Sequence, residues 1–305
     1  MNPKIRGTIC GILAAVSYGT NPLGALNLYA DGYAFATLIL AVMMVAQRKS
    51  FAVTLREIKT LATLGTLMVA SSLTLFFSFN FMDAGIASTI LFVYPVMVAV
   101  IMAVFFKERV TAVTVVSIIL ALSGISLLYK GGDGATLSTI GVLFVIISSL
   151  TYAMYIVVVN KSSLRLSSVK LTFYVLFIGT FILIGYSFVG PDARLQPLTS
   201  MHELVYALVL AVFPTVISLV LMVVAVHDIG STPTAVMGAL EPITAVCIGI
   251  FVFGESFSMR LGIGILLILT AVILIVTGKS LPTQHITYVF SRIGNKVKKK
   301  WRWKS

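Results

Sequence analysis

Residues 94–111 read YPVMVAVIMAVFFKERVT, and residues 241–258 read EPITAVCIGIFVFGESFS. In both stretches a proline in second position, Pro95 or Pro242, is followed 13 residues later by a glutamate. The two prolines are 147 residues apart, and so are the two glutamates. An apolar run between the same two fixed points predicts one helical unit that the chain uses twice.

Weaker matches occur in the same order around this pair. The tripeptide DAG at residues 83–85 corresponds to DIG at residues 228–230. Nearer the start of each half, Gly7 and Gly141 are each followed by a tyrosine 11 residues later. The alternative explanation is chance similarity among apolar helices, but the shared order along the chain favours an internal repeat.

Composition identifies the environment of these helices. Hydrophobic residues make up 59% of the 305 residues, charged residues only 10%, and the mean hydropathy is +1.06. A soluble domain carries roughly 25% charged residues, and disorder requires low hydrophobicity. The two cysteines, Cys10 and Cys247, lie in apolar runs and cannot make a disulfide scaffold. The sequence therefore predicts an all-α integral membrane protein.

Because a helix needs about 20 apolar residues to cross a bilayer, the chain divides into ten expected transmembrane segments. They cover residues 5–28, 33–47, 60–82, 84–106, 110–129, 137–159, 169–190, 204–226, 232–253 and 258–278. The first resembles a signal peptide but is long and lacks a clear cleavage site, so we expect it to be retained. Five helices in residues 1–130 and five in residues 131–278 require the second repeat to be inverted in the membrane.

Basic residues set the orientation. With both termini in the cytoplasm, 19 of the 22 Lys and Arg residues lie on the inside. Residues 279–305 combine an apolar stripe with the sequence KKKWRWKS, which is typical of an amphipathic helix on an anionic membrane surface. Because the lipid bilayer already supplies a negative surface, nucleic acid is not expected as a partner.

The motifs carry a resemblance to a known family. SYGTNP at residues 17–22, the stretch ending in FFKER and the second-half EP…FGES resemble the drug/metabolite transporter superfamily, EamA type. The resemblance extends from about residue 7 to residue 278. It implies a ten-helix exporter or exchanger of small metabolites, such as amino acids, in the cytoplasmic (inner) membrane of a bacterium. Inverted repeats are also typical of alternating-access transporters.

The second segment departs from this pattern. Its 15 residues reach roughly 22 Å, which is short of a hydrocarbon core of about 30 Å. Either the helix begins earlier, within Leu28–Gly32, or part of it is missing. We expect this helix to be the weakest point of the bundle, and a transport-inactive chain is one alternative.

Buried polar residues are the candidates for the site. Glu241 is the only acidic residue well inside a predicted segment, where an ionised carboxylate costs about 3 kcal/mol. It therefore predicts proton coupling or an interaction with a substrate ammonium group. The alternative is a structural role in satisfying the helix break at Pro242. Its counterpart in the first repeat is Tyr94, which carries no charge.

The remaining candidates are polar side chains and prolines at similar depths. Tyr18, Asn21, Tyr94, Tyr152 and Tyr155, with Glu241, are expected to bind an amphipathic substrate. The alternative for the tyrosines is burial as satisfied hydroxyl groups. Pro22, Pro95 and Pro242 are expected to break helices and act as hinges, the last two in mid-helix.

No pattern indicates an enzyme, a cofactor or a metal site, since the three histidines lack metal-ligand spacing and no nucleophile–base pair is visible. The prediction is an alternating-access transporter of small metabolites. A channel-like or lipid-handling membrane protein is the alternative from a different class.

Overall fold

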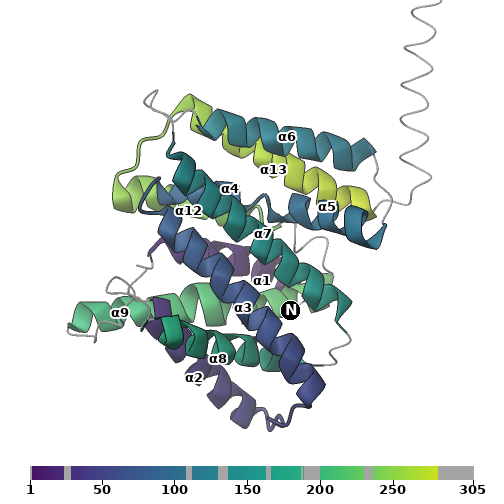
Figure 1. The fold of residues 1–305 in the computed structure, drawn as a ribbon, viewed down its shortest axis with the longest axis vertical. Helices are drawn as coiled ribbons and strands as arrows, with labels where there is room; N and C mark the ends of the chain where they lie inside the picture. The colour runs from purple at the N-terminus through teal and green to yellow at the C-terminus, as the bar shows by residue number, and fades with distance from the viewer. Residues whose placement is uncertain are drawn as a thin grey trace, which may run out of the picture.

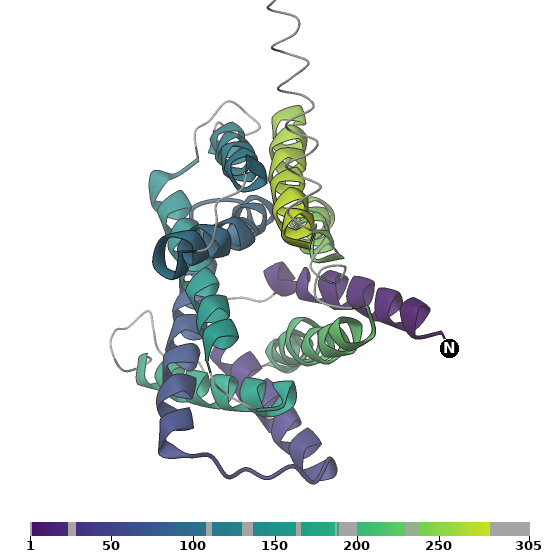
Figure 2. The same cartoon turned by 90° about the vertical axis from the view of Figure 1, so that its right-hand side faces the viewer.

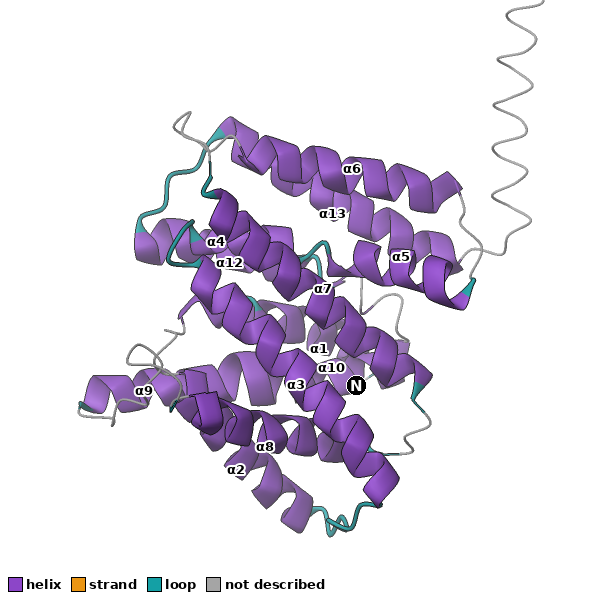
Figure 3. Cartoon of the chain, in the orientation of Figure 1, coloured by secondary structure: helices purple, strands orange, loops and turns teal. Residues whose placement is uncertain are grey.

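The computed structural model describes residues 2–23, 29–107, 112–129, 137–162, 166–186, 188, 200–229, 234 and 237–280. Within these residues every regular element is a helix (Figure 3). The first-half elements are α1 (Pro3–Tyr18), η1 (Asn21–Leu23), α2 (Tyr29–Ala46), α3 (Leu55–Ser78), α4 (Ala84–Leu91), α5 (Tyr94–Phe106) and α6 (Ala112–Tyr129). The second-half elements are α7 (Thr139–Lys161), α8 (Ser168–Tyr186), α9 (Met201–Leu210), η4 (Ala211–Ile217), α10 (Ser218–Ile229), α12 (Leu240–Phe253) and α13 (Met259–Ser280).

Five helical segments are long and apolar enough to cross a bilayer. They are Leu55–Ser78, Ala84–Phe106, Thr139–Val159, Val169–Tyr186 and Met201–Met222. Four shorter apolar helices accompany them, at Asp31–Ala46, Ala112–Leu128, Leu240–Phe253 and Met259–Leu274. The all-helical membrane fold is therefore confirmed at this level. Apart from residues 279 and 280, the expected amphipathic tail lies outside the described residues.

Local sequence signals begin several of these helices. The Asn2 side chain accepts a hydrogen bond from the Lys4 backbone N–H at the start of α1. Thr54 and Glu57 form a reciprocal capping box at the start of α3, which satisfies two otherwise unpaired backbone donors. The same box recurs at Ser200 and Glu203 in α9. Each cap lies where an apolar run begins.

The helices pack in pairs that join distant parts of the chain. At one end of the molecule α6 lies against α13, and at the other end α2 lies against α8 (Figure 1). Between them α3 packs against α7, α4 against α12, and α1 against α10. The turned view shows α1 and α10 side by side (Figure 2). Each of these pairs joins one helix from each half, so neither half forms its core alone.

Two buried clusters correspond to this arrangement. One is built mainly on α4, α5, α6, α12 and α13, with contributions from α3 and α7. The other is built on α2, α3, α8, α9 and η4. Both clusters contain residues of α3, which therefore runs from one cluster to the other (Figure 1).

The second helix is longer than the sequence predicted. It begins at Tyr29 rather than at residue 33, and its 18 residues correspond to about 27 Å. Residues of the Leu28–Gly32 stretch are thus used to lengthen the helix, as in the first of the two alternatives. Its inner face is buried at Tyr33, Ala36 and Leu40, which pack in the second cluster. Its relative stability in the bundle stays a prediction.

Glycine allows the closest helix contacts. A Cβ atom added at Gly7 would lie 2.7 Å from Asp228 Cβ and from Ile229 Cγ2, on the neighbouring α10. One at Gly141 would lie 2.8 Å from the Met82 Cε and Phe81 Cβ atoms. Such distances exclude any side chain unless the helices move apart. The first contact is accompanied by a bidentate ion pair of Arg6 with Asp228, at 2.7 and 2.8 Å.

A Gly7→Ala substitution should test this contact. It should destabilise the protein by about 1–3 kcal/mol through overpacking, despite the higher helix propensity of alanine. Thermal unfolding in detergent measures the effect. Gly185→Ala is the matched control, because no atom lies within 4 Å of its added Cβ, and it should leave the melting temperature unchanged or raise it. Equal effects of the two substitutions would contradict the close packing of α1 and α10.

Candidate functional site

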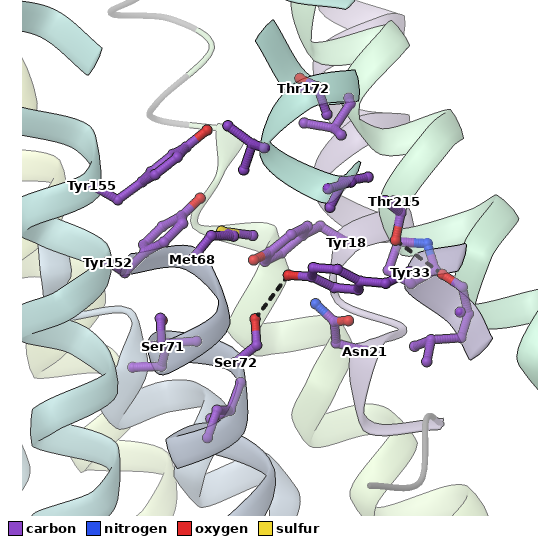
Figure 4. A pocket seen from close by; sticks show the side chains of 18 of the residues that line it. Tyr18, Asn21, Tyr33, Met68, Ser71, Ser72, Tyr152, Tyr155, Thr172 and Thr215 are labelled. Atoms are coloured by element: carbon purple, nitrogen blue, oxygen red, sulfur yellow. Dashed lines mark hydrogen bonds between the residues drawn. The ribbon is translucent and has the colours of Figure 1, made fainter. Parts of the chain in front are cut away.

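A cavity of about 270 Å³ lies in the interior between the two halves. Its walls come from α1, η1, α2, α3, α7, α8, η4 and α10, together with the ends of α4, α5 and α9. Five tyrosines line it, Tyr18, Tyr33, Tyr94, Tyr152 and Tyr155. Figure 4 shows Tyr152 and Tyr155 side by side on one wall, with Tyr18 and Tyr33 opposite them.

The tyrosine rings are held by one another. Tyr94 and Tyr152 meet edge to face with their ring centroids 4.7 Å apart. Tyr152 and Tyr155, one turn apart on α7, are stacked at 5.9 Å. These are favourable aromatic geometries, and they fix the rings in place before any solute binds. Three of the five predicted tyrosine and asparagine candidates thus form one aromatic cluster.

Neutral polar groups complete the wall. The Tyr33 hydroxyl is 3.3 Å from Ser72 Oγ, which is also drawn in Figure 4. The Asn21 amide lines the same cavity. By contrast, Ser71 and Ser148 bond each other's backbone across α3 and α7, at 3.0 and 2.7 Å. This serine pair therefore holds α3 and α7 together, which is a common role of small polar residues between membrane helices.

A second, smaller compartment of about 30 Å³ contains Glu241. It adjoins the larger cavity, since six residues line both: Tyr18, Asn21, Leu75, Leu91, Tyr94 and Tyr152. Five of the six predicted binding residues, all except Tyr155, therefore surround the small compartment. Pro22 and Pro242 line the small compartment as well. Pro95 is not among the residues that line either of the two cavities.

Two of the predicted prolines lie at the starts of helices rather than in mid-helix, and the role of all three as hinges stays a prediction. Pro95 and Pro242 are the second and third residues of α5 and α12. In the first turn a proline removes no intrahelical hydrogen bond, because that N–H has no partner there. The expectation of mid-helix prolines was therefore wrong. The helices end before them, and in the first half of the chain the carbonyl of Leu91 accepts a hydrogen bond from Ser149 Oγ at 3.0 Å.

The start of α12 is held closely by α1. A Cβ added at Gly19 would lie 2.7 Å from the carbonyl oxygen of Glu241 and 2.6 Å from Thr244 Cβ. The end of α1 and the first turn of α12 are therefore in backbone contact. This contact places Glu241 beside Tyr18, and no other acidic residue lines the two cavities within the described part of the chain.

The sequence analysis missed a proline that is inside a helix. Pro214 lies in the π-helical segment η4, where it cannot donate to the Leu210 carbonyl four residues before it. The Thr215 hydroxyl donates to that carbonyl at 3.1 Å, and Ser17 Oγ donates to the Phe213 carbonyl at 2.6 Å. Pro214 and Thr215 both line the larger cavity. The signal was a proline near the middle of the predicted segment 204–226.

Tyr33 and Ser72 were also missed as cavity residues. Each lies in a predicted segment, but only the packing of α2 on α8 and of α3 on α7 turns them toward the cavity. Periodicity alone does not separate an inward-facing hydroxyl from one at the membrane surface.

A more open cavity of about 700 Å³ lies beside the start of α4 and is lined by Glu255. The two carboxylate oxygens of Glu255 accept hydrogen bonds from the Ala84 and Gly85 backbone N–H groups, at 2.8 and 3.2 Å. Burial raises the pKa of this carboxyl, and the two N–H donors oppose that change. The role of Glu255 in the structure is to cap α4.

Metal binding finds no support in the described residues, where no three His, Cys, Asp or Glu side chains form a group that could hold an ion. The arrangement instead suits an amphipathic organic solute, because aromatic faces and neutral hydroxyl groups surround one carboxylate.

Comparisons with known proteins show which family and which fold the chain resembles. The model of the EamA-like transporter family matches residues 5–130 and again residues 139–277. An uncharacterized transporter, YvbV, of Bacillus subtilis is 25% identical over 90% of this chain and 93% of its own length. An uncharacterized transporter of Clostridium kluyveri is 21% identical, with 87% and 91% covered. A crystal structure, described only as that of a protein, has a TM-score of 0.64 at 14% identity and covers 88% of this chain and 97% of its own.

The Glu255 cap leads to a prediction. Glu255→Ala should destabilise the protein by about 1 kcal/mol, the usual cost of losing a helix N-cap, because two backbone donors of α4 lose their acceptor. Glu57→Ala is the control, since this half-buried residue caps only its own helix. Thermal unfolding should show the larger loss for Glu255→Ala. A smaller loss than in the control would exclude this carboxylate as the support of α4.

Proposed function

We infer that this chain, which belongs to the EamA-like transporter family of membrane transporters, carries small amphipathic solutes across the membrane by alternating access. The observation that carries this proposal is the cavity at the interface of the two halves, where several helices are interrupted. Interrupted helices at a central cavity are typical of transporter binding sites. Relatives named as transporters also indicate a transport protein rather than an enzyme.

The proposed architecture is two inverted five-helix repeats, residues 1–130 and 131–278, followed by a basic tail. The double match of the family model supports it. The packing supports it too, because exchanging the halves turns the pairing of α1 with α10 into that of α7 with α3. Gly7 contacts α10 at Asp228, and Gly141 contacts Phe81 and Met82, which directly precede Asp83.

In this proposal the two halves rock about the central cavity, and the interruptions at Pro22, Pro95 and Pro242 act as hinges. Tyr18, Asn21, Tyr94, Tyr152 and Tyr155 would contact the solute. Glu241 would carry the coupling proton, because desolvation makes a lone carboxylate in a membrane interior costly to keep ionised. The titratable side chains that share its compartment are Tyr18, Tyr94 and Tyr152.

The proposed location is the cytoplasmic membrane of a bacterium, with both termini in the cytoplasm. Export or exchange of amino acids is the first activity to test, because the family resemblance suggests it. The cavity favours a carrier over a channel, since tyrosine side chains from opposite walls face each other across it.

Counterflow in proteoliposomes tests the proposal. Vesicles are loaded with an unlabelled mixture of amino acids and amines, and a labelled tracer is added outside. A carrier should accumulate the tracer transiently above its equilibrium level, because outward exchange of unlabelled solute drives inward movement of tracer. Flux that rises with concentration without saturating would instead establish a channel. Absence of any flux with folded protein would favour the transport-inactive alternative.

Glu241→Gln tests the proton. If Glu241 carries it, the substitution should abolish the dependence of exchange on pH while leaving the protein folded, because glutamine keeps the shape but has no titratable group. Glu57→Gln is the control. It should retain the pH profile, because Glu57 lies in the first turn of α3 and lines neither cavity. Unchanged pH dependence in Glu241→Gln removes Glu241 from the coupling role.

A further inference from the structure

The charge of the site is one-sided. Among the described residues that line the two adjoining cavities, Glu241 is the one carboxylic acid, and no Lys, Arg or His is present. A solute carboxylate there would meet only neutral donors and a side chain of its own sign. A solute ammonium group would meet an opposite charge in a region with little water, where such attraction is strongest.

The shape of the site separates two parts of a solute. The compartment beside Glu241 is small, with a volume of about 30 Å³. The adjoining cavity is larger, at about 270 Å³, and is mainly apolar and aromatic. The small compartment, which contains the carboxylate, therefore suits the polar end of a solute, and the larger one suits an apolar body.

The tyrosine rings favour the same orientation. Tyr94 and Tyr152 line both compartments and stand at their junction. An ammonium group close to a tyrosine ring face gains cation–π attraction, which is larger when water is excluded. An aryl group in the larger cavity can pack against Tyr155, which is stacked on Tyr152.

We propose that the solute of this carrier is an amphipathic primary amine, with its ammonium group in the small compartment against Glu241 and its apolar body among the tyrosines of the larger cavity. This inference rests on the proposed transport function and narrows its substrate class. Two classes are disfavoured: solutes with a carboxylate beside the amine, because no cation lines the cavities to compensate it, and quaternary amines, because they have no N–H group to donate to Glu241.

Four probes with one phenyl ring separate these classes. They are phenethylamine, its N,N,N-trimethyl derivative, phenylalanine and 3-phenylpropionate, which differ only in the polar end. Isothermal titration calorimetry on the full chain in nanodiscs measures binding without requiring transport. Phenethylamine should bind about tenfold or more tightly than each of the other three, because each of them either cannot form the charge-assisted hydrogen bond with Glu241 or adds a charge that repels it.

Variants assign this preference to named side chains. Glu241→Gln should weaken phenethylamine binding about tenfold or more and leave 3-phenylpropionate binding unchanged or stronger. Tyr152→Leu should weaken phenethylamine binding, whereas Tyr152→Phe, which keeps the ring, should retain most of it. Glu57→Gln is the control and should bind as the unmodified chain does. Thermal unfolding and size-exclusion profiles establish that each variant is folded.

The inference is overturned if phenylalanine, 3-phenylpropionate or the quaternary amine binds as tightly as phenethylamine, or if Glu241→Gln leaves amine affinity unchanged. Absence of phenethylamine binding to folded protein also overturns it. Counterflow of phenylalanine without binding of phenethylamine would overturn the amine while leaving the carrier intact. Binding of phenethylamine without counterflow of any probe would support the site and contradict the transport function, so the two failures are distinguishable.

Discussion

The structure depends on one constraint: inside a membrane every interruption of a helix leaves backbone groups that the protein itself must satisfy. Here the interruptions lie around the central cavity, and hydroxyl side chains supply the missing bonds. Ser149 bonds the Leu91 carbonyl at the end of α4, and Ser17 and Thr215 bond the Phe213 and Leu210 carbonyls in η4. Irregular backbone is thus confined to where a cavity and neighbouring helices support it.

The same bonds connect the two halves. Ser17 lies on α1 and bonds η4, while Ser149 lies on α7 and bonds α4. Each half therefore satisfies a break in the other, and glycine contacts such as Gly7 against α10 allow the approach that this requires. A movement of one half relative to the other would change the packing at the cavity directly, which is the physical basis of the proposed alternating access.

The sequence predicts candidate site residues where a polar side chain is costly in free energy to bury in a membrane. A glutamate and several tyrosines in apolar segments are expensive to bury, and five of the six predicted residues line the compartment of Glu241. Prediction was less successful where the signal is local backbone geometry. Pro95 and Pro242 were expected in mid-helix and begin helices instead, and Pro214, which is inside one, was overlooked. A proline in the sequence indicates an irregularity in a helix, but the surrounding structure determines the residue at which the helix ends.

Composition and periodicity by themselves determined that this chain is a helical membrane protein with a repeated pattern. Its 59% hydrophobic residues place it in a bilayer, and there a helix satisfies the backbone hydrogen bonds of each apolar segment internally. They also predicted Glu241 and four tyrosines as candidates, and these five residues line the two cavities. Only the tertiary structure decided that Tyr33 faces the cavity, that Glu255 caps α4 and that Glu241 lies in a compartment of about 30 Å³. Those facts depend on which helices meet, and helix pairs between distant segments are fixed by packing rather than by local sequence.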